Sequence, residues 1–192
     1  RPWTGPSQIL PVEMKNDIKN PLSDECVCEA LVQGRLLSAA HAREILKKRE
    51  PLKKKLSKQL PDRDAAEMTV IEIIDSLNKK RPDNPSLPID EEHIYQTLAK
   101  AWQVPYKKID PLKLDLNIVT SIVPHSFARR HLVLPLSIRE GRLTVATPDP
   151  FNSELLEDIA RASNLEVDAV VSSRKEILKL INEFFGFKRS IV

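Results

Sequence analysis

The chain has 192 residues, of which 41% are hydrophobic and 30% are charged, a balance typical of a globular protein with room for one domain or two small ones. No apolar run approaches the roughly 20 residues of a membrane-spanning helix, so we expect no direct insertion into a membrane. The net charge of +3 comes from interspersed acids and bases, and only 5% of the residues are aromatic, which argues against a nucleic-acid-binding surface.

The first 22 residues contain Pro2, Pro6, Pro11 and Pro21 and show little hydrophobic periodicity. We therefore expect residues 1–22 to be a flexible lead-in. The sequence does not begin with Met and lacks the basic-then-apolar layout of a signal peptide, so we expect a fragment of a longer protein.

Residues 23–103 carry apolar side chains at the three- and four-residue spacing of helices. A first helix is expected from Ser23 to Gly34, where the glycine would take the left-handed conformation of a helix end. Ser38 is expected to cap a second helix.

Two further helices are expected before residue 103. The third would begin at Asp64, with Glu67 three residues later as the second half of a capping box. The fourth would follow Asp90, after a proline-rich break at residues 82–88. The sequence thus predicts a helical subdomain over residues 23–103.

Two features of this half could suggest chemistry. The tightest basic cluster is KKREPLKKKLSK, Lys47 to Lys58, which we interpret as a solvated helix end and linker. Cys26 and Cys28 lie two apart and would not face each other on a helix, and no second cysteine pair completes a zinc site. We interpret them as reduced, partly buried thiols and predict no metal site.

The pattern changes in residues 104–192. Residues 115–131 are expected to be helical with a break near Pro124. Apolar residues then alternate over 132–147 around a tight turn at Gly141, which predicts a β-hairpin.

A further helix, strand and helix are expected after this hairpin. The helix would start near Ser153, the strand would span 167–171, and a last helix would run from a cap at Ser173 to an end at Gly186. The predicted fold class is therefore α+β: a helical N-terminal subdomain, then a small α/β subdomain over 104–192 with a three-stranded sheet and helices packed on it.

Asp149 is the residue of this half that most invites a catalytic interpretation. It follows a strand in TPDPF, where many α/β enzymes place a carboxylate. Pro148 and Pro150 stop the strand, however, and no His, Lys or Ser nearby in sequence forms a nucleophile–base pair with it. We interpret Asp149 as a turn and capping residue, and we predict no catalytic residue in the chain.

The same residues carry a family resemblance. LAKAWQVPYKKIDPLKLD, VPHSFARRHLVLPLSIREGRLTVATPDPFNSELLEDI and LEVDAVVSSRKEILKLINEFFG follow one another over about residues 89–186. This order resembles the N-terminal region of type II secretion and type IV pilus assembly ATPases, the general secretory pathway protein E family. Residues 23–80 resemble the first subdomain of that family more weakly.

The resemblance implies an adaptor rather than a motor. The family's ATP site is a P-loop in a C-terminal domain, whereas this chain has no G-x-x-x-x-G-K-[ST], and its four glycines cannot build one. We expect no enzymatic activity and no cofactor. The implied partners are the cytoplasmic domain of an inner-membrane platform protein and the ATPase motor domain of the parent chain, which would place the chain in the cytoplasm, peripheral to the inner membrane.

An alternative is cyclic di-GMP or other nucleotide sensing, because some members of the family bind that ligand here. Their two tandem motifs read R-L-G-x-x-L-x-x-x-G-x-I-x-x-x-x-L-x-x-x-L-x-x-Q. The apolar positions survive in this chain, but the arginine positions hold Cys26 and Thr69. In the first copy Cys28 and Arg35 replace the glycines and Arg49 replaces the glutamine.

In the second copy Ile71 replaces a glycine and Ala101 the glutamine, and 75–88 holds an insertion. Neither Cys nor Thr offers the flat bidentate donor that arginine presents to guanine or phosphate.

Candidate partner-binding residues lie in both halves. Leu36 and Leu37 follow Arg35 in a turn; either both leucines are buried between the first two helices or one is an exposed anchor. Arg129 and Arg130 end a helix, where cations are favourable; the resemblance adds the alternative of a basic patch that meets the motor domain or a neighbouring subunit. We expect the docking surface to lie in the helical half.

Overall fold

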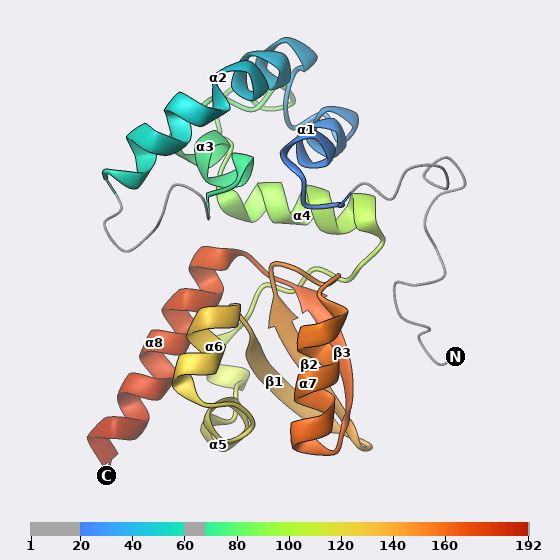
Figure 1. Ribbon diagram of the computed structural model, residues 1–192, viewed down its shortest axis with the longest axis vertical. Coiled ribbons are helices and arrows are strands. Elements are labelled where there is room, and N and C mark those ends of the chain that lie inside the picture. Colours follow the sequence, from blue (N-terminus) through green and yellow to red (C-terminus); the bar gives the residue numbers. More distant parts are fainter. Residues whose placement is uncertain (1–19, 60–67, 192) are drawn as a thin grey trace. The chain divides into compact units, whose positions relative to one another are not determined.

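The computed structural model describes residues 20–59 and 68–191. These fall into two compact units, one formed by residues up to Trp102 and the other by residues from Gln103 onward (Figure 1). The first is helical and the second combines helices with a three-stranded sheet, so the predicted α+β class is confirmed. Most of the expected lead-in, residues 1–22, lies outside the described residues.

The helical unit contains α1 (Asp24–Gln33), α2 (Ala39–Ser57), α3 (Val70–Ser76) and α4 (Glu91–Trp102). Ser38 accepts a hydrogen bond from His41 N–H at 3.2 Å, so the expected cap of the second helix is confirmed. Ser23, where the first helix was expected to start, caps it by accepting a hydrogen bond from Cys26 N–H at 3.3 Å. The helices pack through buried aliphatic residues, among them Leu31, Ile74 and Leu98.

Details of the helix ends in this unit differ from the prediction. α1 ends at Gly34 as expected, but Gly34 has φ −74° and the left-handed residue is Arg35 at φ 58°. The start of the third helix at Asp64 lies outside the described residues; α3 begins at Val70 behind a capping box formed by Thr69 and Glu72. The basic stretch is no linker, because α2 continues through Pro51 to Ser57. Pro51 lacks the backbone N–H of a helical hydrogen bond, and because Pro51 is exposed, the bond that α2 loses lies on its solvent side.

The α/β unit begins with a short 3₁₀ helix and two short α-helices: η3 (Pro111–Lys113), α5 (Leu116–Ser121) and α6 (His125–His131). The sheet and its helices follow as β1 (Leu134–Arg139), β2 (Arg142–Thr147), α7 (Ser153–Ser163), β3 (Glu166–Val171) and α8 (Arg174–Ile191). The predicted helix break near Pro124, the hairpin and the third strand are all confirmed.

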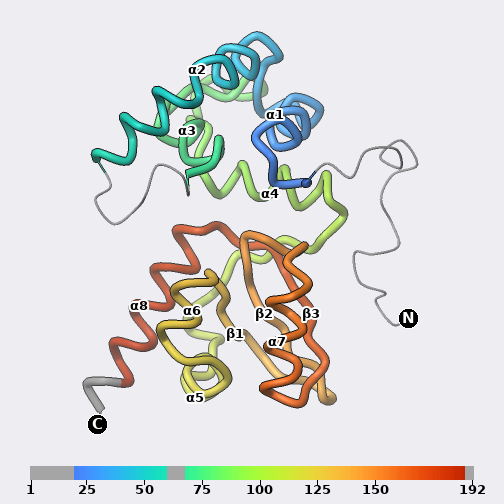
Figure 2. The backbone as a smooth tube through the Cα atoms, viewed as in Figure 1, coloured from blue at the N-terminus to red at the C-terminus, as the bar shows by residue number. Residues whose placement is uncertain are grey.

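The sheet has the order β1-β2-β3, and Figure 2 shows the chain leaving β2, passing through α7 and returning as β3. β1 pairs with β2 antiparallel through a turn at Glu140 and Gly141, both with positive φ, as a two-residue hairpin loop requires. β3 pairs with β2 in parallel. The register of β1 shifts between Pro135 and Ser137.

Helices cover this sheet and enclose the core of the unit. α7 packs against β3, α8 packs against β1 and β2, and α5 and α6 pack against α8. The buried core includes Val119, Leu143, Ile159 and Ile177. Gly186 does not end the last helix, contrary to the prediction: the next residues stay helical because Phe185 is buried and Lys188 Nζ donates to Thr120 O at 3.2 Å.

Candidate functional site

One carboxylate at the start of α1 contacts both α2 and α3. Asp24 Oδ2 accepts a hydrogen bond from Lys53 Nζ of α2 at 2.8 Å. Its other oxygen, Oδ1, accepts one from Val70 N–H, the first residue of α3, at 2.9 Å. The Asp24 and Lys53 side chains are only 13% and 15% exposed. A single charged side chain therefore joins three helices in a partly buried place, where such bonds are stronger than at the surface.

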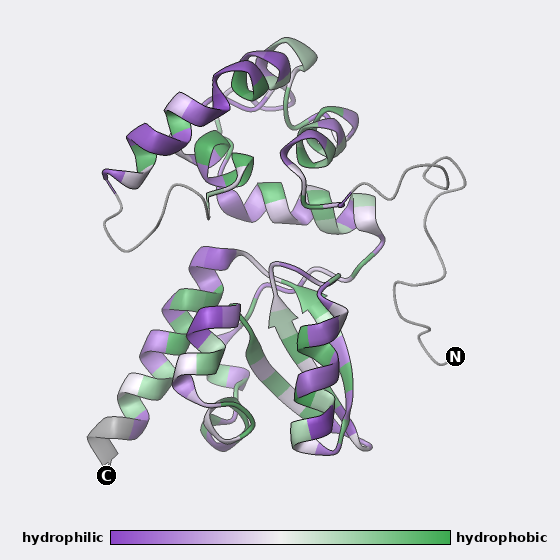
Figure 3. Cartoon of the chain, in the orientation of Figure 1, coloured by the Kyte–Doolittle hydropathy of each residue, from purple (hydrophilic) through white to green (hydrophobic). Residues whose placement is uncertain are grey.

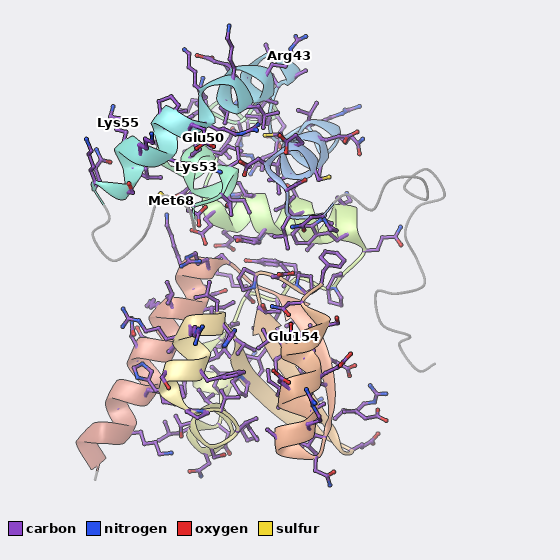
Figure 4. The ribbon with its side chains drawn as sticks, in the orientation of Figure 1. Arg43, Glu50, Lys53, Lys55, Met68 and Glu154 are labelled. Carbon is purple, nitrogen blue, oxygen red and sulfur yellow. The ribbon has the colours of Figure 1, made fainter. Side chains whose placement is uncertain are left out.

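A second pair extends this network toward solvent. Arg49 NH1 of α2 lies 2.8 Å from Glu25 Oε1 of α1, and Arg49 Nε lies 3.9 Å from Asp24 Oδ2. Two cations of the basic stretch are thus used inside the helical unit, which corrects the interpretation of that stretch as solvated throughout. In Figure 4, Lys53 is labelled beside α3, whereas Arg43 and Lys55 lie on the outer side of α2.

The two cysteines lie in α1, in the same helix as Asp24 and Glu25. Both are free and buried, more completely than the partial burial we expected. Burial, with the negative charges of Asp24 and Glu25, raises the pKa of the Cys28 thiol to about 12. A thiol with such a pKa is almost wholly protonated at neutral pH and is a poor nucleophile. Within the described residues, no group of three His, Cys, Asp or Glu side chains could hold a metal ion.

Residues at the ligand-contacting positions of the two cyclic di-GMP motifs have structural roles in this chain. Cys26, at the first arginine position, is 8% exposed, and Arg49 pairs with Glu25. Thr69, at the second arginine position, caps α3: its N–H donates to Glu72 Oε2 at 2.8 Å, and its hydroxyl accepts from Ile71 N–H at 3.2 Å. Each of these side chains is therefore already engaged in local structure.

The two leucines proposed as a possible exposed anchor are both buried. Leu36 is 4% exposed and Leu37 is 2% exposed, whereas Arg35 before them is exposed. The left-handed conformation of Arg35 turns the chain so that both following N–H groups donate to Leu31 O, at 2.9 and 3.2 Å. The alternative that both leucines are buried is therefore correct, and the exposed-anchor alternative is wrong.

Asp149 has the geometry of a turn residue. Its Oδ1 accepts a hydrogen bond from Phe151 N–H at 3.0 Å, and its own N–H donates to Thr147 Oγ1 at 3.1 Å. Burial raises the pKa of the Asp149 carboxyl, and the backbone N–H groups of Phe151 and Asn152 partly oppose that rise. These bonds agree with the turn interpretation.

Arg129 and Arg130 lie in the last turn of α6 and are exposed. Cations are favourable at a helix C-terminus, and His131 beside them packs on Phe127 with ring centroids 4.5 Å apart. These arginines belong to the α/β unit and Arg35 belongs to the helical unit. The five candidate residues therefore do not form one cluster within either unit.

The comparison with known families concerns the α/β unit. Residues 102–191 match the MshEN domain. These residues form an MshEN domain. The match covers the sheet and every helix from η3 to α8, so the resemblance to the N-terminal region of secretion and pilus ATPases is confirmed there.

Curated relatives extend the comparison. The chain is 26% identical over 107 residues to the type IV pilus assembly ATPase TfpB of Acinetobacter baylyi, which is 55% of this chain and 18% of that protein. It is 27% identical over 100 residues to the type IV pilus assembly ATPase PilB of Myxococcus xanthus, again 18% of the relative. The chain thus matches less than a fifth of the length of these ATPases.

Solved structures share the fold over more of the chain than the MshEN domain alone. The structure of MshE with cdg matches this chain with a TM-score of 0.52 at 17% identity, and the match covers 82% of this chain and 97% of the MshE chain. The N-terminal domain of XpsE has a TM-score of 0.52 at 20% identity, covering 85% and 97%. At this identity the likeness concerns the fold. Within the described residues, no helix is both long and apolar enough to cross a membrane.

Proposed function

We propose that this chain is the non-catalytic N-terminal adaptor of a type II secretion or type IV pilus assembly ATPase. In this role it links the motor domain of the parent chain to an inner-membrane platform protein and stays peripheral to the membrane. The observation that supports the adaptor role most directly is the MshEN domain at 102–191 together with homology to pilus ATPases.

The helical unit offers a docking surface of defined charge. Figure 3 shows that α2 is predominantly hydrophilic, and its exposed cations are Arg43, Lys47, Lys48, Lys54 and Lys55. Lys53 and Arg49 pair with Asp24 and Glu25 within the unit, and Lys48 pairs with Glu44 on α2 itself. The docking proposal therefore rests on Arg43, Lys47, Lys54 and Lys55. We propose that this outer face of α2 docks on an acidic surface of the platform protein's cytoplasmic domain, where charge complementarity speeds association and fixes orientation.

Charge reversal on the whole chain tests this docking. Lys54→Glu with Lys55→Glu should weaken binding to the platform protein's cytoplasmic domain by about tenfold or more in calorimetry, with a smaller salt dependence than the wild type. Both side chains are exposed, so the fold should be unaffected. The matched control is Arg129→Glu with Arg130→Glu, which places the same charge change in the MshEN domain. Docking through α2 would be contradicted if both double variants weakened binding equally, or if neither weakened it.

Arg129 and Arg130 have a separate proposed role, a contact with the parent protein's motor domain. Their exposure at the end of α6 supports this contact. In the full-length parent, reversing both charges should change ATP turnover without changing affinity for the platform protein. Unchanged turnover would remove this part of the proposal.

We further propose that the chain alone neither hydrolyses ATP nor binds cyclic di-GMP tightly. MshE, one of the structural neighbours, was solved with cdg, that is, cyclic di-GMP. Here, however, the two arginine positions hold a buried cysteine and a capping threonine, which cannot supply bidentate donors. Calorimetry should show no binding at about 1 μM; a dissociation constant at or below that value, about 8 kcal/mol of binding free energy, would favour the sensing alternative.

A further inference from the structure

Pro51 removes a backbone hydrogen bond from α2 shortly before the docking lysines Lys54 and Lys55. Proline has no N–H, so Pro51 cannot donate to Lys47 O, the acceptor four residues earlier. Both buried residues of α2 precede Pro51, and every side chain of residues 52–57 is half-buried or exposed. The last turns of α2 therefore lie beyond a missing hydrogen bond and have no buried side chain to hold them.

Asp24 of α1 contacts cations on both sides of Pro51. Its Oδ2 accepts a hydrogen bond from Lys53 Nζ at 2.8 Å and lies 3.9 Å from Arg49 Nε. Arg49 and Lys53 are four residues apart and therefore share a face of α2. Pro51, two residues from each, lies on the opposite, exposed face. One carboxylate oxygen thus joins the helical turns before and after the proline.

The carboxylate that makes these contacts is itself held in place. Its second oxygen, Oδ1, accepts a hydrogen bond from Val70 N–H of α3 at 2.9 Å. The Asp24 and Lys53 side chains are 13% and 15% exposed, so water competes little for the ion pair between them. Asp24 therefore gives the end of α2 a fixed point of attachment to α1 and α3.

The position of Lys53 decides where the next two side chains point. Lys54 and Lys55 follow it at steps of about 100° around the helix axis, and both are exposed. Figure 4 shows Lys53 beside α3 and Lys55 on the outer side of α2. If residues 52–57 were free to unwind, a partner would have to order them on binding, and the entropy lost in that step would lower its affinity.

We propose that Asp24 is a positioning residue for docking. It holds residues 52–57 in line with the rest of α2 across Pro51, and so presents Lys54 and Lys55 to the acidic surface of the platform protein's cytoplasmic domain. When Lys53 is released, residues 52–57 fray while the first part of α2 stays folded. The effect on binding rests on the proposed docking through α2, whereas the effect on residues 52–57 does not.

Hydrogen exchange of the 192-residue chain, followed amide by amide by NMR, tests this role. Lys53→Met removes the ion pair, leaves α3 bonded to Asp24 and keeps a good helix former. The amides of residues 54–57 should then exchange at least about tenfold faster relative to the amides of α4. The matched control is Lys48→Met, which breaks the exposed pair with Glu44 before the proline and should leave the amides of 54–57 unchanged.

Pro51→Ala shows whether the proline is the reason. Alanine restores the N–H that donates to Lys47 O. In the double variant with Lys53→Met, the amides of residues 54–57 should therefore return to within about threefold of the wild type, relative to α4. A general loss of stability would instead accelerate the amides of α1, α2 and α4 by one factor. Such uniform acceleration, equal effects of Lys53→Met and Lys48→Met, or no recovery with Pro51→Ala would overturn the proposal.

Calorimetry with the platform protein's cytoplasmic domain tests the consequence for docking. Lys53→Met should weaken binding by about fivefold, because the partner must order residues 52–57. Adding Pro51→Ala should recover most of that loss although it restores no charge, so the loss cannot be assigned to the missing charge of Lys53.

The reversal Lys54→Glu with Lys55→Glu separates the two proposals, since it should weaken binding with or without Pro51→Ala. If the reversal weakens binding and Lys53→Met does not, the positioning role of Asp24 is wrong. If the reversal leaves binding unchanged, docking through α2 is wrong, and the exchange of residues 54–57 alone then decides whether Asp24 holds the end of α2.

Discussion

Gly34, at the end of α1, lies against Thr97 of α4 so closely that a methyl group would not fit. A Cβ built on Gly34 would stand 2.3 Å from Thr97 Cγ2 and 3.2 Å from Ala30 O. The φ of Gly34 is −74°, so the backbone conformation does not demand glycine here. The close approach of the two helices is what demands it.

Gly34→Ala should therefore destabilise the helical unit by overpacking, by about 1–3 kcal/mol in chemical denaturation. Thr97 cannot easily rotate away, because it is β-branched and its hydroxyl donates to His93 O at 2.8 Å. Thr97→Ser removes the methyl group and keeps that hydroxyl. The double variant should recover most of the loss, and a purely additive result would show that the contact is not the cause.

Asp24 should be the most sensitive charged residue of the helical unit. Asp24→Ala removes the acceptor for both Lys53 and Val70 and should cost about 2 kcal/mol. Asp24→Asn keeps an acceptor for Val70 and should cost about half as much. The control is Lys48→Ala, which breaks the exposed pair with Glu44 on the same helix and should change the unfolding free energy by less than about 0.5 kcal/mol. Equal losses for Asp24→Ala and Lys48→Ala would contradict this.

The partly buried carboxyl of Asp149 predicts a pH dependence of definite sign. Because the folded-state pKa lies above the ordinary 3.8, the folded state binds more protons than the unfolded state between these two values, and stability falls as pH rises through that window. Asp149→Asn keeps the acceptor for Phe151 N–H without the charge. Relative to the wild type it should gain stability as the pH rises from about 3 to neutral. Thermal unfolding of the wild type and Asp149→Asn across this pH range checks the prediction. A difference in stability between the two proteins that does not change with pH would contradict it.

Two glycines should respond to alanine in opposite directions. Gly186 lies inside α8, and a Cβ there would meet no atom within 4 Å. Gly186→Ala should raise the free energy of unfolding by about 0.5–1 kcal/mol, because alanine loses less backbone entropy in a helix. Gly141 has equally open surroundings but φ +76°, so Gly141→Ala should destabilise the hairpin by about 1 kcal/mol. The same sign for both would refute this account.

Local sequence signals were sufficient for most elements of the fold. The helix start at Ser23, the cap at Ser38 and the alternation in the hairpin depend on neighbours in sequence, and each is confirmed. The helix end at Gly34 is confirmed, although the left-handed residue is Arg35 and not the glycine. The end predicted at Gly186 is wrong, because contacts from a distant segment keep the next residues helical. A capping-box pattern was assigned to Asp64 and Glu67, although Thr69 and Glu72 offer the same pattern and form the box that is observed.

The ion pairs and hydrogen bonds of Asp24 could not be predicted from the sequence, because they join residues that are far apart along the chain. Lys53 and Asp24 are 29 residues apart, and Val70 and Asp24 are 46 apart. Within a run of lysines, nothing local distinguishes the one that is buried from those that face solvent. The one available signal was the acidic pair Asp24 and Glu25 in the first turn of α1. It did not reveal the ion pairs with α2, because acidic residues are common at a helix N-terminus for a local reason, the favourable helix dipole.

The strand order of the MshEN domain has a consequence for aggregation. β1 and β3 are the sheet edges, and exposed edges are templates for intermolecular strand pairing. In β1, Pro135 has no N–H to offer and the register shift beside it bends the strand. At β3, Val171 already exchanges hydrogen bonds with Pro105 O and Lys107 N–H, and the strand carries Glu166 and Asp168. A crowded solution of this protein should therefore stay free of strand-to-strand polymers.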